Sequence, residues 1–183
     1  MTNSANLTHD LTRERADLLE ALQAQRRFLR FTAEGLSDDD ARRRTTASEL
    51  TVGGVIKHVA DTERGWARFM TGAGLPGSDL DIDWSNPDPT AIAAYTNGFV
   101  LLPDETLAGV LADYDEVAAT TDELVASLPD LDTEYPLPTA PWFPPGAHRS
   151  VRRAIVHIVA ETAQHAGHAD IIREAIDGQK TMG

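Results

Sequence analysis

Residues 150–178 read SVRRAIVHIVAETAQHAGHADIIREAIDG, and this stretch has the pattern of one long helix. Its apolar side chains return at helical spacing along one face; they are Val151, Ile155, Ile158, Val159 and Ile172. Gly178 is a residue type that readily ends a helix. The stretch therefore predicts an amphipathic helix from about Ser150 to Gly178, which needs other helices to cover its apolar face.

Three earlier segments show the same periodicity. From Leu107 to Leu128 the apolar positions alternate in steps of three and four, until Pro129 stops the helix. A second helix is predicted from about Thr51 to Met70. Its broad apolar face consists of Val52, Val55, Ile56, Val59, Trp66 and Phe69.

The first helical segment carries leucines at compatible spacing, with Thr8 or Asp10 expected as its cap and Gly35 as its end. These leucines are Leu11, Leu18, Leu22 and Leu29. Long stretches that hold most of the glycine and proline separate the four segments. In the first of them, from Gly72 to Pro103, residues 89–99 are expected to form one short helix.

The connection between the last two helices is rich in proline, with six of the ten prolines between Pro129 and Pro145. Proline cannot donate a hydrogen bond to a β ladder, so neither long connection is predicted to contain a strand. The sequence therefore predicts an all-α fold, a four-helix bundle with long connections. Residues 1–183 are expected to form a single domain.

The composition limits the chemistry that this chain can carry. With 183 residues the chain is long enough to bury a core without a structural metal, and it contains no cysteine. A disulfide framework, a thiolate zinc site and a cysteine nucleophile are therefore excluded. Any metal must be held by histidine or by a carboxylate.

Charge and hydropathy exclude further classes of partner. The 16 basic and 29 acidic residues give a net charge of −13, which disfavours nucleic acid and anionic membranes as partners. The first 15 residues lack the apolar segment of a secretory signal. No stretch approaches the roughly 18 uninterrupted apolar residues of a membrane span. A cytoplasmic protein is expected.

Three of the six histidines and one glutamate share a stripe of the last helix. At about 100° per residue, His157, Glu161, His165 and His168 fall within about 80° of one another, beside the apolar face. Glu161 and His165, four residues apart, can reach one ion, although such a pair can also simply hydrogen-bond. His58 borders the apolar face of the second helix in the same way.

These positions suggest a metal site built from two helices. His58, Glu161 and His165 provide three protein ligands and leave positions open, which is the pattern of a catalytic rather than a structural divalent metal. His168 is expected to orient a ligand or to contact substrate, and His157 to lie at the surface or beside a ligand.

Two motifs resemble a known family. LTVGGVIKHVADTERGW and, much later, HIVAETAQHAGHADIIREAIDG are similar to the DinB/YfiT-like superfamily of metal-binding four-helix bundles, in its branch related to mycothiol-dependent enzymes. The resemblance spans nearly the whole chain. It implies His58, Glu161 and His165 as ligands, with Glu161 in place of the commoner third histidine, as in mycothiol-dependent maleylpyruvate isomerase.

The resemblance also implies an activity. Members of this superfamily include S-transferases and isomerases that use a low-molecular-weight thiol, so we expect a transferase that joins mycothiol to electrophilic small molecules, in detoxification or stress response. Zinc is the expected metal, with nickel, manganese and iron as alternatives because a carboxylate ligand favours harder ions. Homodimerisation, common in the superfamily, is left open.

Two other functions remain open at this point. A bound metal that activates water instead of a thiol would make the protein a hydrolase. A bundle that binds a metal or ligand without turnover would be a non-catalytic, stress-associated protein.

Several further residues have two interpretations. Glu63 falls within the apolar arc of its helix and is expected to pair with an arginine rather than to act as a base. Trp66 and Phe69 are expected in the core. The basic cluster Arg149, Arg152 and Arg153 either binds an anionic co-substrate or neutralises nearby carboxylates. Residues 142–146 form either a lid or a tight surface loop.

Overall fold

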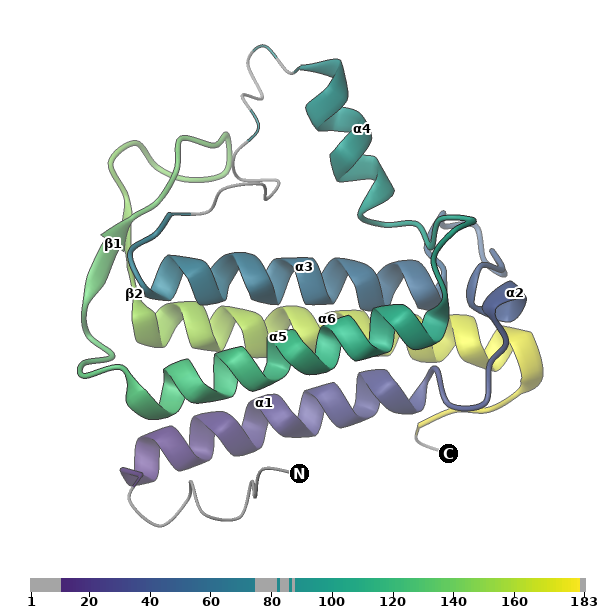
Figure 1. Cartoon of the computed structure of the whole chain (residues 1–183), viewed down its shortest axis with the longest axis horizontal. Coiled ribbons are helices and arrows are strands. Elements are labelled where there is room, and N and C mark those ends of the chain that lie inside the picture. Colours follow the sequence, from purple (N-terminus) through teal and green to yellow (C-terminus); the bar gives the residue numbers. More distant parts are fainter. Residues whose placement is uncertain (1–10, 75–81, 83–85, 87, 182–183) are drawn as a thin grey trace.

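The computed structural model describes residues 11–74, 82, 86 and 88–181. Four long helices form the bundle (Figure 1), namely α1 (Arg13–Phe31), α3 (Val52–Met70), α5 (Leu107–Ser127) and α6 (Val151–Asp177). Smaller elements lie in the connections: α2 (Asp38–Ala41), α4 (Pro89–Asn97), β1 (Glu134–Pro136) and β2 (His148–Ser150). The predicted four-helix bundle is confirmed.

Each long helix starts at a hydroxyl side chain. The Oγ atoms of Thr12, Thr51, Thr106 and Ser150 accept a hydrogen bond from a backbone amide of the first turn. Such caps satisfy amides that have no partner within the helix. Thr8 and Asp10, predicted as the first cap, lie outside the described residues, and the observed cap is Thr12. Gly178 ends α6 in the left-handed conformation, at φ +82°.

Not all helices that follow one another in the chain are neighbours in the bundle. In cross-section the order around the bundle is α1, α6, α3, α5, so that α1 and α3 lie on one diagonal. Side-chain pairs give the directions: Lys57 meets Glu105 and Arg64 meets Asp113, so α3 and α5 run parallel. A parallel pair needs a long return path, and residues 71–106 with α4 provide it (Figure 1).

The core consists of two apolar clusters along the bundle. One lies toward α2 and includes Leu29, Ile56 and Ile172, and the other lies toward the strands and includes Leu22, Phe69 and Ile155. Trp66 and Phe69 belong to the second cluster, as the sequence predicted. No helix in the described part of the chain is both long and apolar enough to cross a membrane.

The structure corrects one prediction about the connections. The proline-rich connection does contain a strand, because β1 pairs antiparallel with β2 and Pro136 lies opposite His148. In a two-stranded ribbon each strand is an edge strand, so proline is tolerated where a ladder bond is not needed. The predicted short helix in the other connection is confirmed as α4, capped by Asp88 and with Pro89 in its first turn.

Candidate metal centre

The three residues predicted as ligands meet between α3 and α6. His58 of α3 faces Glu161 and His165 of α6, and the three residues offer ligand atoms that all lie within 4.8 Å of one another. The two helices run antiparallel, since His58 contacts His165 whereas Trp66, two turns later, contacts His157. The side chains are only partly accessible, 12% for His165 and 28% for Glu161.

The spacing within this cluster is too wide for hydrogen bonds of normal strength. His165 Nε2 lies 3.5 Å from Glu161 Oε2, and His157 Nε2 lies 3.7 Å from Glu161 Oε1. A normal N–H···O bond measures about 2.9 Å. Among the described residues, no lysine or arginine reaches Glu161 to neutralise it. The cluster is therefore a set of electron-pair donors without a cation.

Protonation at neutral pH suits the same role. Burial, with a contribution from neighbouring His165, lowers the pKa of His58 to about 4, so its ring is neutral at pH 7. The contact from His165, long for a hydrogen bond at 3.5 Å, is the main factor that lowers the pKa of Glu161, and the neighbouring rings of His157 and His58 lower it further, so Glu161 is ionised. Neutral imidazole and carboxylate are the forms that bind metal, so this donor set fits a divalent cation.

Two further histidines touch the cluster. His168 Nδ1 lies 3.5 Å from Nδ1 of His165. The ring of His157 stands edge-on to Trp66, with 4.8 Å between the ring centroids. Residues in such places fix the orientation and tautomer of a ligating ring. The structure thus puts both of them in the places from which they could orient the cluster.

Phe99 is a part of the site for which the sequence pattern gave no prediction. Its ring stacks on His58 with 4.1 Å between centroids and 21° between planes, and so covers the cluster from the segment after α4. The approach is close, because a Cβ on Gly54 would lie 2.0 Å from the carbonyl oxygen of Phe99. A glycine in the first turn of a helix was the one available hint, since glycine weakens helices elsewhere.

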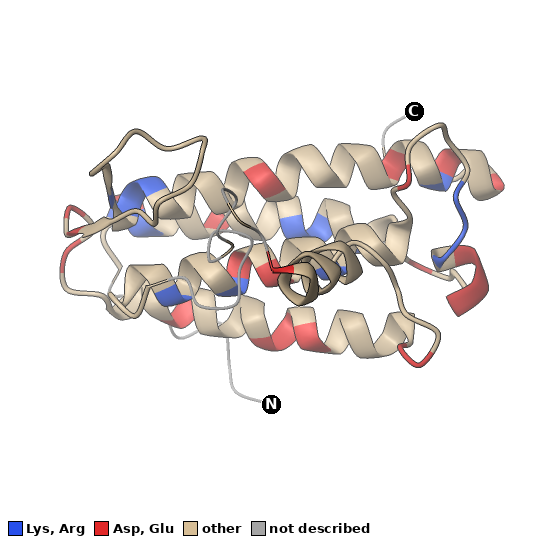
Figure 2. Cartoon of the chain, turned by 90° about the horizontal axis from the view of Figure 1, so that it is seen from above, with Lys and Arg blue, Asp and Glu red and all other residues tan. Residues whose placement is uncertain are grey.

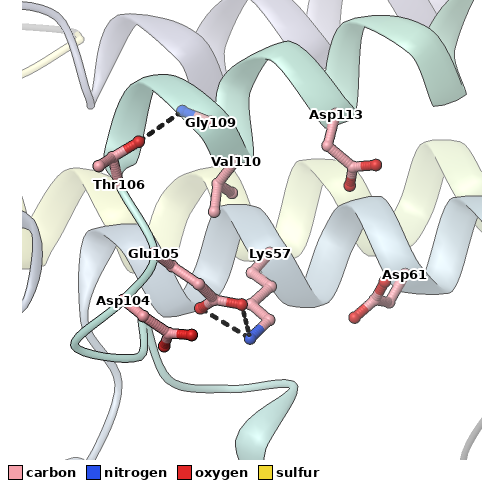
Figure 3. A pocket seen from close by; sticks show the side chains of 8 residues that line it. All are labelled: Lys57, Asp61, Asp104, Glu105, Thr106, Gly109, Val110 and Asp113. Atoms are coloured by element: carbon pink, nitrogen blue, oxygen red, sulfur yellow. Dashed lines mark hydrogen bonds and ion pairs between the residues drawn. The ribbon is translucent and has the colours of Figure 1, made fainter.

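A cavity of about 340 Å³ lies between α3 and α5 (Figure 3). Lys57 in its wall pairs with Glu105, and Asp61 and Asp113 in its wall both pair with Arg64. None of the three cluster residues lines it. The full lining is Lys57, Asp61, Asp104, Glu105, Thr106, Gly109, Val110 and Asp113. Its carboxylates disfavour an anion and favour groups that donate hydrogen bonds.

The sequence model of one protein family covers most of this chain. The model for mycothiol S-transferases matches residues 17–178, a range that includes all three cluster residues. The chain belongs to the mycothiol S-transferase family. A comparison with curated protein sequences found no match.

Two solved structures are similar to that of this family member. A conserved protein from Enterococcus faecalis aligns with a TM-score of 0.66 at 12% identity, covering 92% of this chain and all of that one. YfiT from Bacillus subtilis, described as a probable metal-dependent hydrolase with an unusual four-helix bundle topology, aligns with a TM-score of 0.61 at 16% identity, covering 90% and 89%. At such identities the likeness shows the fold alone, and the predicted DinB/YfiT-like fold is confirmed.

The structure also places the other residues singled out in the sequence. Glu63 pairs with an arginine as predicted: Arg26 donates to both of its oxygens. Arg152 neutralises the carboxylates of Glu14 and Asp132. In the segment expected to be a lid or a surface loop, Trp142 is 49% exposed.

Proposed function

We propose that this chain is a metal-dependent S-transferase that joins mycothiol to an electrophilic small molecule. The observation that carries the proposal is the convergence of His58, Glu161 and His165 on one point in a chain without cysteine. Since the chain has no sulfur nucleophile of its own, a reactive sulfur has to arrive on a second substrate. Membership of the mycothiol S-transferase family supports mycothiol as that substrate.

A divalent metal at this cluster, with zinc as the first candidate, would lower the pKa of a thiol at its open positions. Neighbouring side chains hold the proposed ligands in fixed positions. His58 is neutral and held by stacking on Phe99, and His165 is in contact with His168. Fixed ligands leave little reorganisation to be made during the reaction.

The reaction itself balances simply. The thiol loses its proton, its sulfur forms a bond to the electrophilic carbon, and either a leaving group departs or a neighbouring atom takes up a proton. The protein contributes orientation and partial exclusion of water at the half-buried cluster. His168 and His157 are proposed to keep the ligands in position rather than to react.

The test is a conjugation assay with zinc-loaded protein, mycothiol and a panel of electrophiles. Changing a residue that contacts a ligand already lowers affinity or activity about 10- to 100-fold, so His58→Ala should lower the rate by more than about 100-fold. His148→Ala is the matched control, because His148 is exposed on β2 and its ring nitrogen contacts the carbonyl oxygen of Gly146. A zinc-loaded wild type that conjugates no electrophile would refute the proposal.

A second candidate function is metal-assisted hydrolysis. Its support is that YfiT, which shares this fold, is described as a probable metal-dependent hydrolase. The same three ligands leave open positions that suit water as well as a thiol. Turnover of ester or amide substrates by the zinc-loaded protein without any added thiol would favour hydrolysis over transfer.

A further inference from the structure

Arg149 is a cation that lacks a carboxylate partner in the described part of the chain. It lies at the centre of β2, and its guanidinium stacks over the ring of Trp66 at 4.5 Å and near that of Phe143 at 5.4 Å. Its Nη1 atom is buried and makes no hydrogen bond to any described residue. A buried donor without a partner is uncommon and costs free energy, so it asks for an explanation.

A neighbouring arginine, unlike Arg149, is paired with carboxylates. Arg152, three residues further on, is held by Glu14 and Asp132. The chain has 29 acidic residues against 16 basic ones, so an intramolecular partner would be easy to supply. Burial and the nearby charge of Arg153 instead lower the pKa of Arg149. Arg152 and Arg153 in the first turn of α6 follow Arg149 in the chain, so basic residues are grouped at this end of the helix (Figure 2).

This cation lies in a row of side chains that ends at the metal centre. Arg149 stacks on Trp66, whose ring lies 4.8 Å from that of His157, and His157 Nε2 lies 3.7 Å from Glu161. Arg149 is also close enough for its charge to lower the pKa of His157. A ligand held by the guanidinium would therefore be linked to the cluster through the contacts of Trp66 and His157.

We propose that Arg149, supported by Arg153, binds the carboxylate of an anionic small molecule near the start of α6, two side chains away from the metal centre. Taking that molecule to be the electrophile rests on the proposed transferase function. A carboxylate matches the planar fork of one guanidinium, which donates two parallel hydrogen bonds to it. A doubly charged phosphate is less suited, because only two cations face it and the whole chain carries a charge of −13.

The binding test needs no turnover. Benzoate and its neutral analogue benzamide are titrated into the full chain, with and without zinc, while NMR signals of the Arg149 Nε–H and the Trp66 indole are followed. Benzoate should shift both signals in both forms, and benzamide should shift neither. Arg149→Gln should weaken benzoate binding about tenfold or more, because a hydrogen bond to a charged group is lost.

Two further variants separate a binding role from a structural one. Arg149→Lys keeps the charge but loses the fork, so its affinity for benzoate should lie between wild type and Arg149→Gln. Arg152→Gln removes a guanidinium three residues away and should change the affinity by less than about twofold, since exposed ion pairs contribute little. An Arg152→Gln variant that loses benzoate as completely as Arg149→Gln would overturn the proposal.

Other outcomes that would overturn it are benzoate binding only when zinc is present, unchanged binding in Arg149→Gln, or tighter binding of inorganic phosphate than of benzoate. The transferase function is judged separately. If Arg149→Gln loses benzoate but no electrophile is conjugated, the anion site stands and the proposed reaction fails. If both hold, Arg149→Gln should raise KM about tenfold for a carboxylated electrophile and leave KM for a neutral one unchanged.

Discussion

Helix α3 carries two polar groups of side chains that differ in one respect. Glu63 is 1% exposed and receives hydrogen bonds at both oxygens from Arg26, which also pairs with Asp122 at 2.7 Å. His58, five residues earlier, meets Glu161 and His165 with no cation among them. One group is closed, since Arg26 pairs with both carboxylates, and the other is open.

The difference teaches how to separate structural from functional polar groups in a bundle. Buried charges are tolerated when they are paired, and the donor and acceptor atoms of a paired group are already occupied, so they are not available to a ligand. An open group of donors at ligand spacing costs stability in the metal-free protein and gains its partner from outside. We therefore assign the Glu63 group to the fold and the His58 group to function.

The largest expected effect is on the closed group. Glu63→Ala leaves the Nε–H and Nη2–H donors of Arg26 buried without an acceptor, although Asp122 still pairs with Nη1. Each buried donor left unpaired costs about 1–3 kcal/mol or more on a charged group, so the free energy of unfolding should fall by about 3–5 kcal/mol. Urea denaturation measures this. Arg13→Ala is the control, because its pair with Asp17 is exposed and should contribute less than about 1 kcal/mol. Equal losses in the two variants would remove the distinction between a closed and an exposed pair.

A substitution in the open group should change the affinity for metal rather than the stability of the metal-free protein. Glu161→Gln removes a charged ligand and should weaken zinc binding by more than about 100-fold, with unfolding changed little. Competition with a coloured chelator measures the affinity. Glu174→Gln, an exposed change on the same helix, should bind zinc as wild type does. If Glu161→Gln keeps its zinc, the carboxylate is not a ligand.

A smaller effect concerns Phe99, which covers the open group. Gly54→Ala places a methyl group against the carbonyl oxygen of Phe99, so it should destabilise the protein by about 1–3 kcal/mol and weaken zinc binding as the ring moves off His58. Gly167→Ala on α6 meets nothing within 4 Å and should stabilise by up to about 1 kcal/mol. A Gly54→Ala variant as stable as Gly167→Ala would show that Phe99 does not need this close approach.

A further effect is a pH dependence of the metal-free protein. The pKa of His58 is about 4 in the folded chain and 6.5 for an ordinary histidine. Between pH 4 and pH 6.5 this side chain therefore binds a proton in the unfolded chain but not in the folded chain. Stability should therefore fall as the pH decreases from about 6.5 to about 4. In His58→Asn this part of the dependence should vanish. A profile identical to that of wild type would place His58 in contact with water.

Much of this arrangement could be predicted from the sequence, because helical periodicity is local. The apolar spacing located all four long helices, and the angular positions of His58, Glu161 and His165 put them at the border of the core. The odd position of Glu63 in an apolar arc correctly indicated an arginine partner. These are statements about one helix at a time.

The missing parts depend on contacts between segments far apart in the chain. Periodicity does not say which helices are neighbours, so the parallel pairing of α3 and α5 could not be predicted. Phe99 comes from a connection without a pattern of its own, and the identity of Arg26 as partner of Glu63 required the packing of α1. Arg149 looked like the arginines beside it until the structure showed which of them are paired.

The most direct test of the central claim is to replace zinc by cobalt(II) and to record its visible absorption spectrum. The account predicts intense bands of four- or five-coordinate cobalt in wild type, a change in these bands when mycothiol is added, and loss of the bands in His165→Ala but not in His148→Ala. Bands that persist in His165→Ala, or that do not respond to the thiol, would contradict an open metal centre at His58, Glu161 and His165.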